Sequence, residues 1–108
     1  MKATRGVMNI VGAGLAGTLL AIVLARRGCK VEVFERRDDP RVRGAERGRS
    51  INLALAARGL RGLEIAGVTA HVAPLLIPMR GRYVHQHDGT GDLLLYGQDE
   101  TEVIHSVS

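Results

Sequence analysis

The sequence predicts an α/β fold that begins with a βαβ unit at 7–35 and ends in a β-hairpin at about 80–97. Three observations predict it. A short apolar stretch runs into a glycine-rich turn, apolar residues then recur at helical spacing, and a second stretch rich in β-formers follows. This order of strand, helix and strand is the building block of a doubly wound sheet, so we expect a Rossmann-like unit at the N-terminal end.

The first strand is predicted to end at a turn with Gly12, Gly14 and Gly17, spaced as Gly-x-Gly-x-x-Gly. In such a unit the first glycine permits the tight turn, the second lets the backbone approach a pyrophosphate, and the third lets the helix pack closely on the strand. The first-turn amides and the helix dipole attract an anion. The pattern therefore predicts a nucleotide cofactor.

The predicted helix begins near Leu15 and closes with Arg26, Arg27 and Gly28, because basic residues complement the helix dipole and glycine suits the position after the last turn. Residues 7–25 carry no charge, so a membrane or secretory segment is an alternative. Three glycines and Asn9 argue against it, since each glycine weakens a helix by about 1 kcal/mol relative to alanine. We expect no membrane association from this segment.

A second strand is predicted at 30–35, and it ends in Glu35. A carboxylate at this position accepts hydrogen bonds from ribose hydroxyls. Arg36 and Arg37 follow, and a basic residue nearby can accommodate the 2′-phosphate of NADP. Because an acid is present at this position, we expect a ribose whose 2′-hydroxyl carries no phosphate, and hence FAD or NAD.

Composition argues against several other classes. The single cysteine, Cys29, cannot form an internal disulfide, which fits a reducing compartment, and we expect it to pack as a small hydrophobe. The net charge of +4 comes without a nucleic-acid fold signature, and attraction of anionic small molecules explains it equally well. His85 and His87 would share a strand face, but two ligands do not make a structural metal site. We expect a cytoplasmic protein of one domain at most, with no metal and no nucleic acid.

The second half is predicted to hold a surface loop at 36–49, a short extended segment at 50–55 and a helix at about 56–66 that Gly67 closes. Strands at 80–87 and 93–96 flank the turn-forming residues 88–91. A hairpin centred on Gly89 sets Arg82 opposite Tyr96, with Cβ atoms about 5 Å apart. This register predicts that the two side chains share one face.

Several strings are more specific than the glycine pattern. They are Gly48-Arg49-Ser50-Ile51-Asn52-Leu53-Ala54-Leu55, Arg58-Gly59, Ile77-Pro78-Met79-Arg80-Gly81-Arg82 with His85, Tyr96-Gly97 and Ser106-Val107-Ser108. In them, and from about residue 7 to the last residue, the chain resembles the kynurenine 3-monooxygenase family of single-component flavin monooxygenases. The resemblance implies FAD as cofactor, NADPH and O₂ as co-substrates, and hydroxylation of L-kynurenine to 3-hydroxykynurenine.

The resemblance also implies roles for individual residues. It places the FAD diphosphate at Gly12, Gly14, Ala16 and Gly17, the adenosine end at Phe34, Glu35, Arg36 and Arg37, and further cofactor contacts at Arg49 and Ala54. It assigns the substrate carboxylate to Arg82 and Tyr96. A guanidinium fork binds a carboxylate through two hydrogen bonds, and a phenol adds another donor. No residue is expected to be a chemical catalyst, because the flavin carries the oxidation.

The chain departs from the family pattern at Asn9, Ala56 and His105, and most of all in length, because family members are several times longer. We expect an N-terminal part that holds at most the ADP portion of FAD and is not active alone. Two alternatives stay open. One is another Rossmann FAD- or NAD-dependent oxidoreductase, and the other is a non-catalytic truncated nucleotide-binding fragment.

Overall fold

The structure, a computed structural model, describes residues 6–43, 53–99 and 102–107. Its elements are β1 (Met8–Val11), α1 (Leu15–Arg26), β2 (Val31–Phe34), α2 (Pro40–Arg43), β3 (Leu53–Leu55), α3 (Ala57–Ala66), α4 (Thr69–Val72), the 3-10 helix η1 (Ala73–Leu75), β4 (Ile77–Met79), β5 (Gly81–His85), β6 (Gly91–Leu95) and β7 (Ile104–Val107). The chain divides into two compact units. The first comprises residues 1–49 with 62–68, and the second comprises 50–61 with 69–108.

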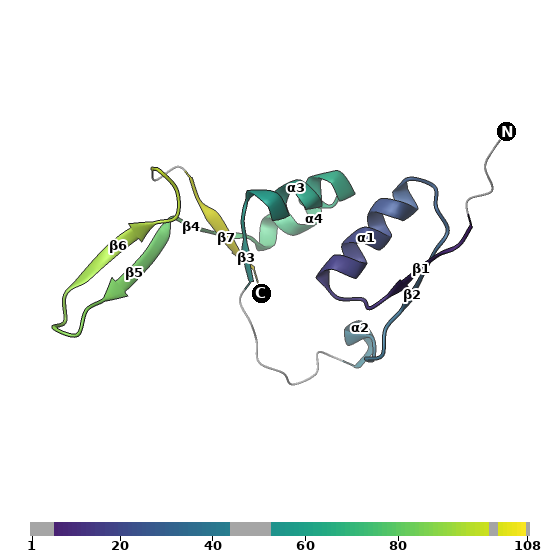
Figure 1. Cartoon of the computed structure of the whole chain (residues 1–108), viewed down its shortest axis with the longest axis horizontal. Helices are drawn as coiled ribbons and strands as arrows, with labels where there is room; N and C mark the ends of the chain where they lie inside the picture. The colour runs from purple at the N-terminus through teal and green to yellow at the C-terminus, as the bar shows by residue number, and fades with distance from the viewer. Residues whose placement is uncertain (1–5, 44–52, 100–101, 108) are drawn as a thin grey trace. The chain divides into compact units, whose positions relative to one another are not determined.

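The first unit contains the βαβ arrangement that the sequence predicted. β1 and β2 pair in parallel, with Ile10 opposite Val33, and α1 connects them (Figure 1). The pairing extends into the glycine turn, because the Gly12 amide donates to the Phe34 carbonyl at 2.7 Å. The carboxyl ends of both strands therefore meet at one edge, where open α/β sheets bind their ligands.

Glycine ends α1 where the sequence placed the end of the helix. Gly28 has a φ of +81°, in the left-handed region that glycine adopts at no steric cost. The Cys29 amide donates to the Leu24 carbonyl at 3.0 Å, and the Gly28 amide donates to the Ala25 carbonyl at 2.9 Å. These two bonds form a Schellman motif, which satisfies carbonyls that the helix itself leaves unpaired.

The C-terminal part of α3 packs in the first unit through small residues. A side chain at Gly62 would lie 3.3 Å from Leu19 of α1, so its absence lets the two helices approach closely. Ala66 is fully buried and Ile10 is 9% exposed, and these are the buried apolar residues of the described chain. Gly67 ends α3 at a φ of +70°, as predicted. None of the described helices has the length and apolar character to cross a bilayer.

The surface loop predicted at 36–49 contains a short helix, α2, so the prediction was wrong at residues 40–43. Asp39 accounts for the helix, because its carboxylate accepts the Arg41 amide at 2.9 Å and Pro40 takes the first helical position. The Arg41 side chain pairs with the same carboxylate, with 2.6 Å between Nη2 and Oδ2. These bonds lower the pKa of Asp39 to about 2. The residues from 44 to 52 lie outside the described part.

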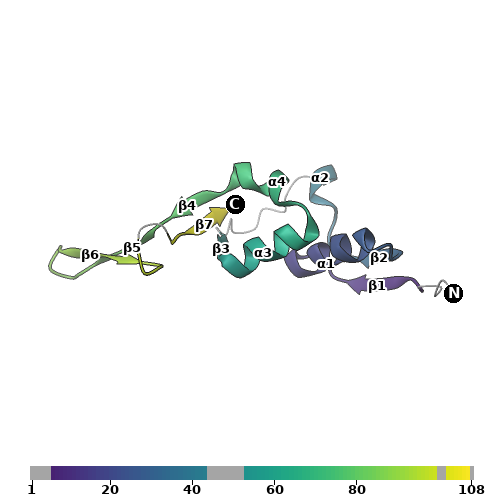
Figure 2. The same ribbon diagram turned by 90° about the horizontal axis from the view of Figure 1, so that it is seen from above.

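The second unit holds a three-stranded antiparallel sheet in the order β3-β7-β4 (Figure 2). An extended segment was expected at 50–55, and β3 forms the part of it that the structure describes. Leu55 lies against the first turns of α3, where a side chain at Gly59 would come within 3.1 Å of it. His105, in the central strand, buries an Nδ1 atom that has no hydrogen-bond partner in the described chain, and a buried polar atom without a partner costs stability.

The hairpin at β5 and β6 is present, but its centre is one residue earlier than predicted. Arg82 lies opposite Leu94, not opposite Tyr96. The loop explains the difference. The Gln86 amide donates to the Thr90 carbonyl at 2.7 Å and Gly89 has a φ of +88°, so Gly89 is the last residue of a three-residue loop instead of its centre.

Candidate functional site

The glycine turn follows β1 and leads directly into α1. Gly12 has a φ of +102°, a conformation that L-residues with side chains rarely adopt. Gly14 is the N-cap of α1 in an extended conformation, and its carbonyl accepts the Thr18 amide at 3.0 Å as the first helical bond. The turn therefore delivers the chain from strand to helix within three residues.

The structure separates the roles of Gly14 and Gly17. A Cβ atom at Gly17 would overlap the carbonyl oxygen of Gly12 and would lie 3.4 Å from Ile10 Cγ2. Among the described residues, no atom lies within 4 Å of the position that a Cβ atom at Gly14 would take. Gly17 is thus required by packing within the protein, whereas the missing side chain at Gly14 leaves space that the described residues do not fill. A diphosphate fits this space, as the pattern requires.

The start of α1 offers hydrogen-bond donors to this open space. The first amides of a helix, including that of Ala16, have no intrahelical acceptor, and the helix dipole adds partial positive charge. Gly14 supplies no side-chain cap. The first turn contains no acidic residue that would repel an anion. These properties suit a phosphate group.

Glu35 follows β2 and reaches the glycine turn. Its Oε2 accepts the Ala13 amide at 2.8 Å, and its Oε1 accepts the Arg37 amide at 3.0 Å. The Ala13 bond, followed by the Arg37 bond, lowers the pKa of Glu35, so the carboxyl is ionised at neutral pH. A carboxylate has about four lone-pair sites. The two amides use two of them, so the carboxylate has further capacity to accept ribose hydroxyls.

The residues around Glu35 form an exposed edge with apolar and basic members. Phe34 is 54% exposed at the end of β2. The Arg37 side chain is 60% exposed and its Nε lies 3.8 Å from Glu35 Oε1. Arg36 is exposed between them. An apolar ring beside cationic side chains is a surface that an adenine base and its phosphates can contact.

Two predicted site residues of the second unit share a face despite the changed register. Arg82 lies opposite Leu94, and Tyr96 is two residues further along the same strand direction. The Tyr96 amide donates to the Arg80 carbonyl at 3.0 Å, which extends the same register. Arg82 and Tyr96 are therefore diagonal neighbours, at a typical separation of about 7–8 Å instead of 5 Å. An arginine side chain spans that distance.

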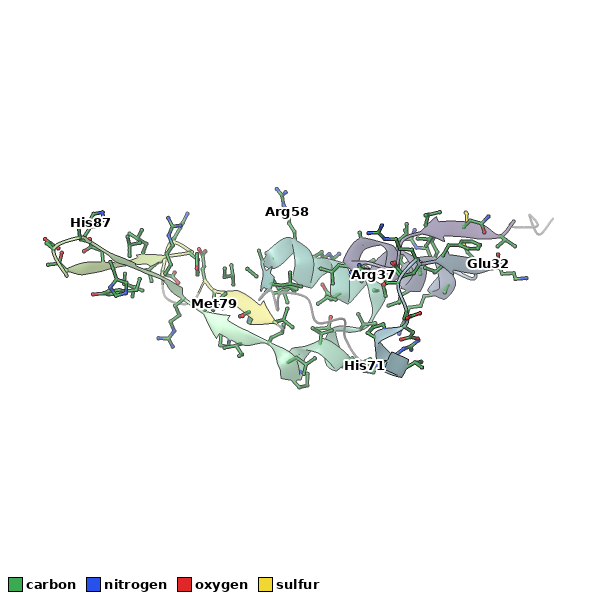
Figure 3. The ribbon with its side chains drawn as sticks, turned by 90° about the horizontal axis from the view of Figure 1, so that it is seen from below. Glu32, Arg37, Arg58, His71, Met79 and His87 are labelled. Atoms are coloured by element: carbon green, nitrogen blue, oxygen red, sulfur yellow. The ribbon has the colours of Figure 1, made fainter. Side chains whose placement is uncertain are left out.

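The remaining residues that the sequence analysis singled out do not join either group of site residues in the described structure. Ala54 lies in the middle of β3, opposite Ser106, and Arg49 falls outside the described residues. His85 ends β5 and packs edge-on against Tyr83, with ring centroids 4.9 Å apart. His87 lies in the hairpin loop, so the two histidines do not share a strand face (Figure 3). Within the described ranges, no group of three or more metal-binding side chains occurs.

The Ala13 amide is the functional group that the sequence did not reveal. It lies 22 residues before Glu35, and alanine carries no chemical signal of its own. The bond depends on a backbone donor and on the parallel pairing of β1 with β2. The only sequence signal for it is the position of an acid at the end of the second strand.

Comparisons with known proteins agree with the Rossmann-like fold. A family model described as an NAD(P)-binding Rossmann-like domain matches residues 10–73. The chain is 53% identical over 100 residues to kynurenine 3-monooxygenase from Stenotrophomonas maltophilia (strain K279a). It is 54% identical over 100 residues to the protein of that name from Xanthomonas euvesicatoria pv. vesicatoria (strain 85-10). Each match covers 93% of this chain and 22% of the relative.

Proposed function

Because the chain belongs to the NAD(P)-binding Rossmann-like domain family, we propose that its first unit binds the ADP portion of FAD. In this proposal the chain is the N-terminal portion of a flavin monooxygenase of the kynurenine 3-monooxygenase type. Gly12, Gly14, Ala16 and Gly17 receive the diphosphate, and Glu35 receives the ribose hydroxyls. Phe34, Arg36 and Arg37 complete the contacts with this part of FAD, and Arg49 and Ala54 are proposed as further cofactor contacts because the resemblance implies them.

One observation carries the nucleotide assignment. The space in front of Gly14 is open, while the equivalent space at Gly17 is filled by the Gly12 carbonyl. A turn built only for packing would need Gly17 and not Gly14. The opening lies at the N-cap of α1, whose first amides suit a diphosphate, and Glu35 is bonded to the adjacent Ala13 amide, from where it can accept ribose hydroxyls.

The choice of FAD rests on the relatives, and Glu35 argues only against NADP. The similar curated proteins are named kynurenine 3-monooxygenase. FAD bound at this site would supply the redox chemistry, and the residues of this chain would hold and orient it. A 2′-phosphate would face the Glu35 carboxylate, so NADP is disfavoured at this site. NAD is the second candidate, because the matching family model is described by NAD(P) binding.

We further propose that Arg82 and Tyr96 bind the carboxylate of an amino-acid substrate such as L-kynurenine. They lie on one face of the hairpin, and Arg82 is exposed. The guanidinium fork and the phenol hydroxyl supply three donors to the carboxylate oxygens. Neither group takes part in bond breaking, so both serve to orient the substrate.

The chain spans 22% of the length of the curated relatives it matches. Hydroxylation of L-kynurenine with NADPH and O₂ is therefore proposed for an assembly in which the remaining part of such a protein is present. We expect the 108 residues alone to bind nucleotide without hydroxylating. NADPH-dependent formation of 3-hydroxykynurenine by the chain alone would contradict this expectation.

The test of the nucleotide site is a titration of the chain with ADP, FAD and NAD. We expect ADP and FAD to bind, and the Gly14→Val variant to lose binding because its side chain fills the diphosphate space. The matched control is Gly6→Val, since Gly6 also has open surroundings but lies outside the turn. Equal affinity in Gly14→Val and wild type would refute the site, and binding of NAD but not FAD would favour the second candidate.

The substrate assignment is tested by nuclear magnetic resonance (NMR) titration with L-kynurenine. Arg82→Gln is expected to abolish shifts at the hairpin amides. The control is Arg58→Gln, because Arg58 projects from α3 into solvent (Figure 3). Hairpin shifts that persist unchanged in Arg82→Gln, or that vanish equally in Arg58→Gln, would contradict the assignment.

A further inference from the structure

The glycine turn is held by a side chain from a different strand. Ala13, between the first two glycines, donates its amide to Glu35 Oε2 at 2.8 Å. Its carbonyl accepts the Thr18 hydroxyl at 3.3 Å. The peptide units on both sides of Ala13 are therefore fixed by side chains, one from the end of β2 and one from α1.

Such fixing matters because glycine restricts the backbone least, and two of the three residues between β1 and α1 are glycines. Gly12 adopts a positive φ, and no atom of the residues that the structure describes lies within 4 Å of the Cβ position of Gly12 or Gly14. Glycine loses more conformational freedom on ordering than any other residue. A turn ordered before the ligand arrives binds more tightly, since the ordering does not then oppose association.

We propose that Glu35 is a positioning residue for the phosphate-binding turn, in addition to its proposed contact with ribose. This inference rests on the proposed nucleotide function. Through the Ala13 amide, Glu35 holds the turn in the conformation that receives a diphosphate. It therefore increases affinity for the phosphate part of the ligand even when no ribose is present.

A ribose-free ligand separates this role from the contact with ribose. Inorganic pyrophosphate cannot use a ribose contact, and it is repelled by the negative charge of Glu35. If Glu35 only binds ribose, Glu35→Gln should leave pyrophosphate affinity unchanged or increase it. If Glu35 positions the turn, the same variant should decrease that affinity. The two roles thus predict opposite signs.

Three variants isolate position from charge. Glu35→Gln removes the charge and leaves one side-chain oxygen where two amides need acceptors. Glu35→Asp keeps the charge but withdraws the carboxylate by one methylene. The matched control is Glu32→Gln, which changes the net charge by the same amount. Glu32 is exposed in β2, opposite Asn9 (Figure 3).

The experiment is an NMR titration of the full chain with pyrophosphate and with ADP. We expect both Glu35 variants to weaken the binding of pyrophosphate about threefold or more. The apparent affinity falls in proportion to the fraction of molecules whose turn has the binding conformation. Glu35→Gln should weaken ADP further, and Glu32→Gln should not weaken either ligand. Unchanged or tighter pyrophosphate binding in both Glu35 variants would overturn the proposal.

A measurement without ligand separates the two proposals from each other. In the ligand-free chain, Glu35→Gln should accelerate hydrogen exchange of the Ala13 amide. The neighbouring Gly12 amide, which donates to Phe34, should keep its protection. If the wild-type chain binds neither ADP nor pyrophosphate, the nucleotide function fails, and this exchange alone decides the positioning role. Unchanged exchange at Ala13, or equal acceleration at Gly12, would overturn it.

Discussion

Gly14 and Gly17 lie three residues apart, and alanine at each should have opposite consequences. In Gly17→Ala the new methyl overlaps the Gly12 carbonyl oxygen, so either strand or helix must move. In Gly14→Ala the methyl enters open space, and the φ of −76° is allowed for alanine. The first substitution should destabilise the fold, and the second should impair only the ligand site.

The magnitudes follow from opposing contributions. Alanine at Gly17, within α1, gains about 1 kcal/mol of helix propensity. Overpacking costs roughly 1–3 kcal/mol, and a clash with backbone lies at the upper end. The free energy of unfolding should therefore fall by about 2 kcal/mol, or roughly 30-fold in the unfolding equilibrium. At Gly14, losing glycine at the N-cap costs up to about 1 kcal/mol. The lower entropy of the unfolded chain offsets about 0.4–1 kcal/mol of this.

The assay combines urea unfolding, followed by circular dichroism, with ADP titration. Gly17→Ala should lower the urea midpoint, and Gly14→Ala should leave it nearly unchanged while weakening ADP. Gly6→Ala is the control, because Gly6 is open and lies before β1. A Gly17→Ala protein as stable as wild type, or a Gly14→Ala protein with lower stability and unchanged ADP affinity, would refute the separation of roles.

Three further predictions concern the ion pair and the hairpin. Asp39 has a pKa lowered from 3.8 to about 2, chiefly by the Arg41 side chain, so its stabilising contribution is complete above about pH 4 and is lost as the pH falls towards 2. Asp39→Asn should flatten this part of the stability profile, and an unaltered profile would contradict the assignment. Gly89→Ala should destabilise the hairpin by about 1–2 kcal/mol because of its positive φ, as hairpin amide exchange would report. Gly91→Ala should disturb the Tyr83 ring, which lies where the methyl would be, and unshifted ring resonances would exclude that packing.

Local signals in the sequence predicted the parts of the fold that depend on neighbouring residues. Particular residues favour particular backbone conformations, and this explains the glycine pattern, the helix ends at Gly28 and Gly67 and the strand that leads to Glu35. The register of the hairpin could not be predicted from such local signals. Turn-forming residues surround Gly89 on both sides, and only the hydrogen bonds of the loop decide which residue is its centre. The helix at 40–43 was missed because Asp39 and Pro40, which start it, are also common in loops.

The sequence by itself determined that a strand, a glycine turn, a helix and an acid follow one another in the order that suits a nucleotide. These features are local, and each residue type limits its own backbone. Only the tertiary structure decided what each glycine is for, because the crowding at Gly17 and the opening at Gly14 depend on atoms of β1 and its turn. It also joined Glu35 to the Ala13 amide, since the parallel pairing of β1 with β2 brings together two residues that are 22 positions apart.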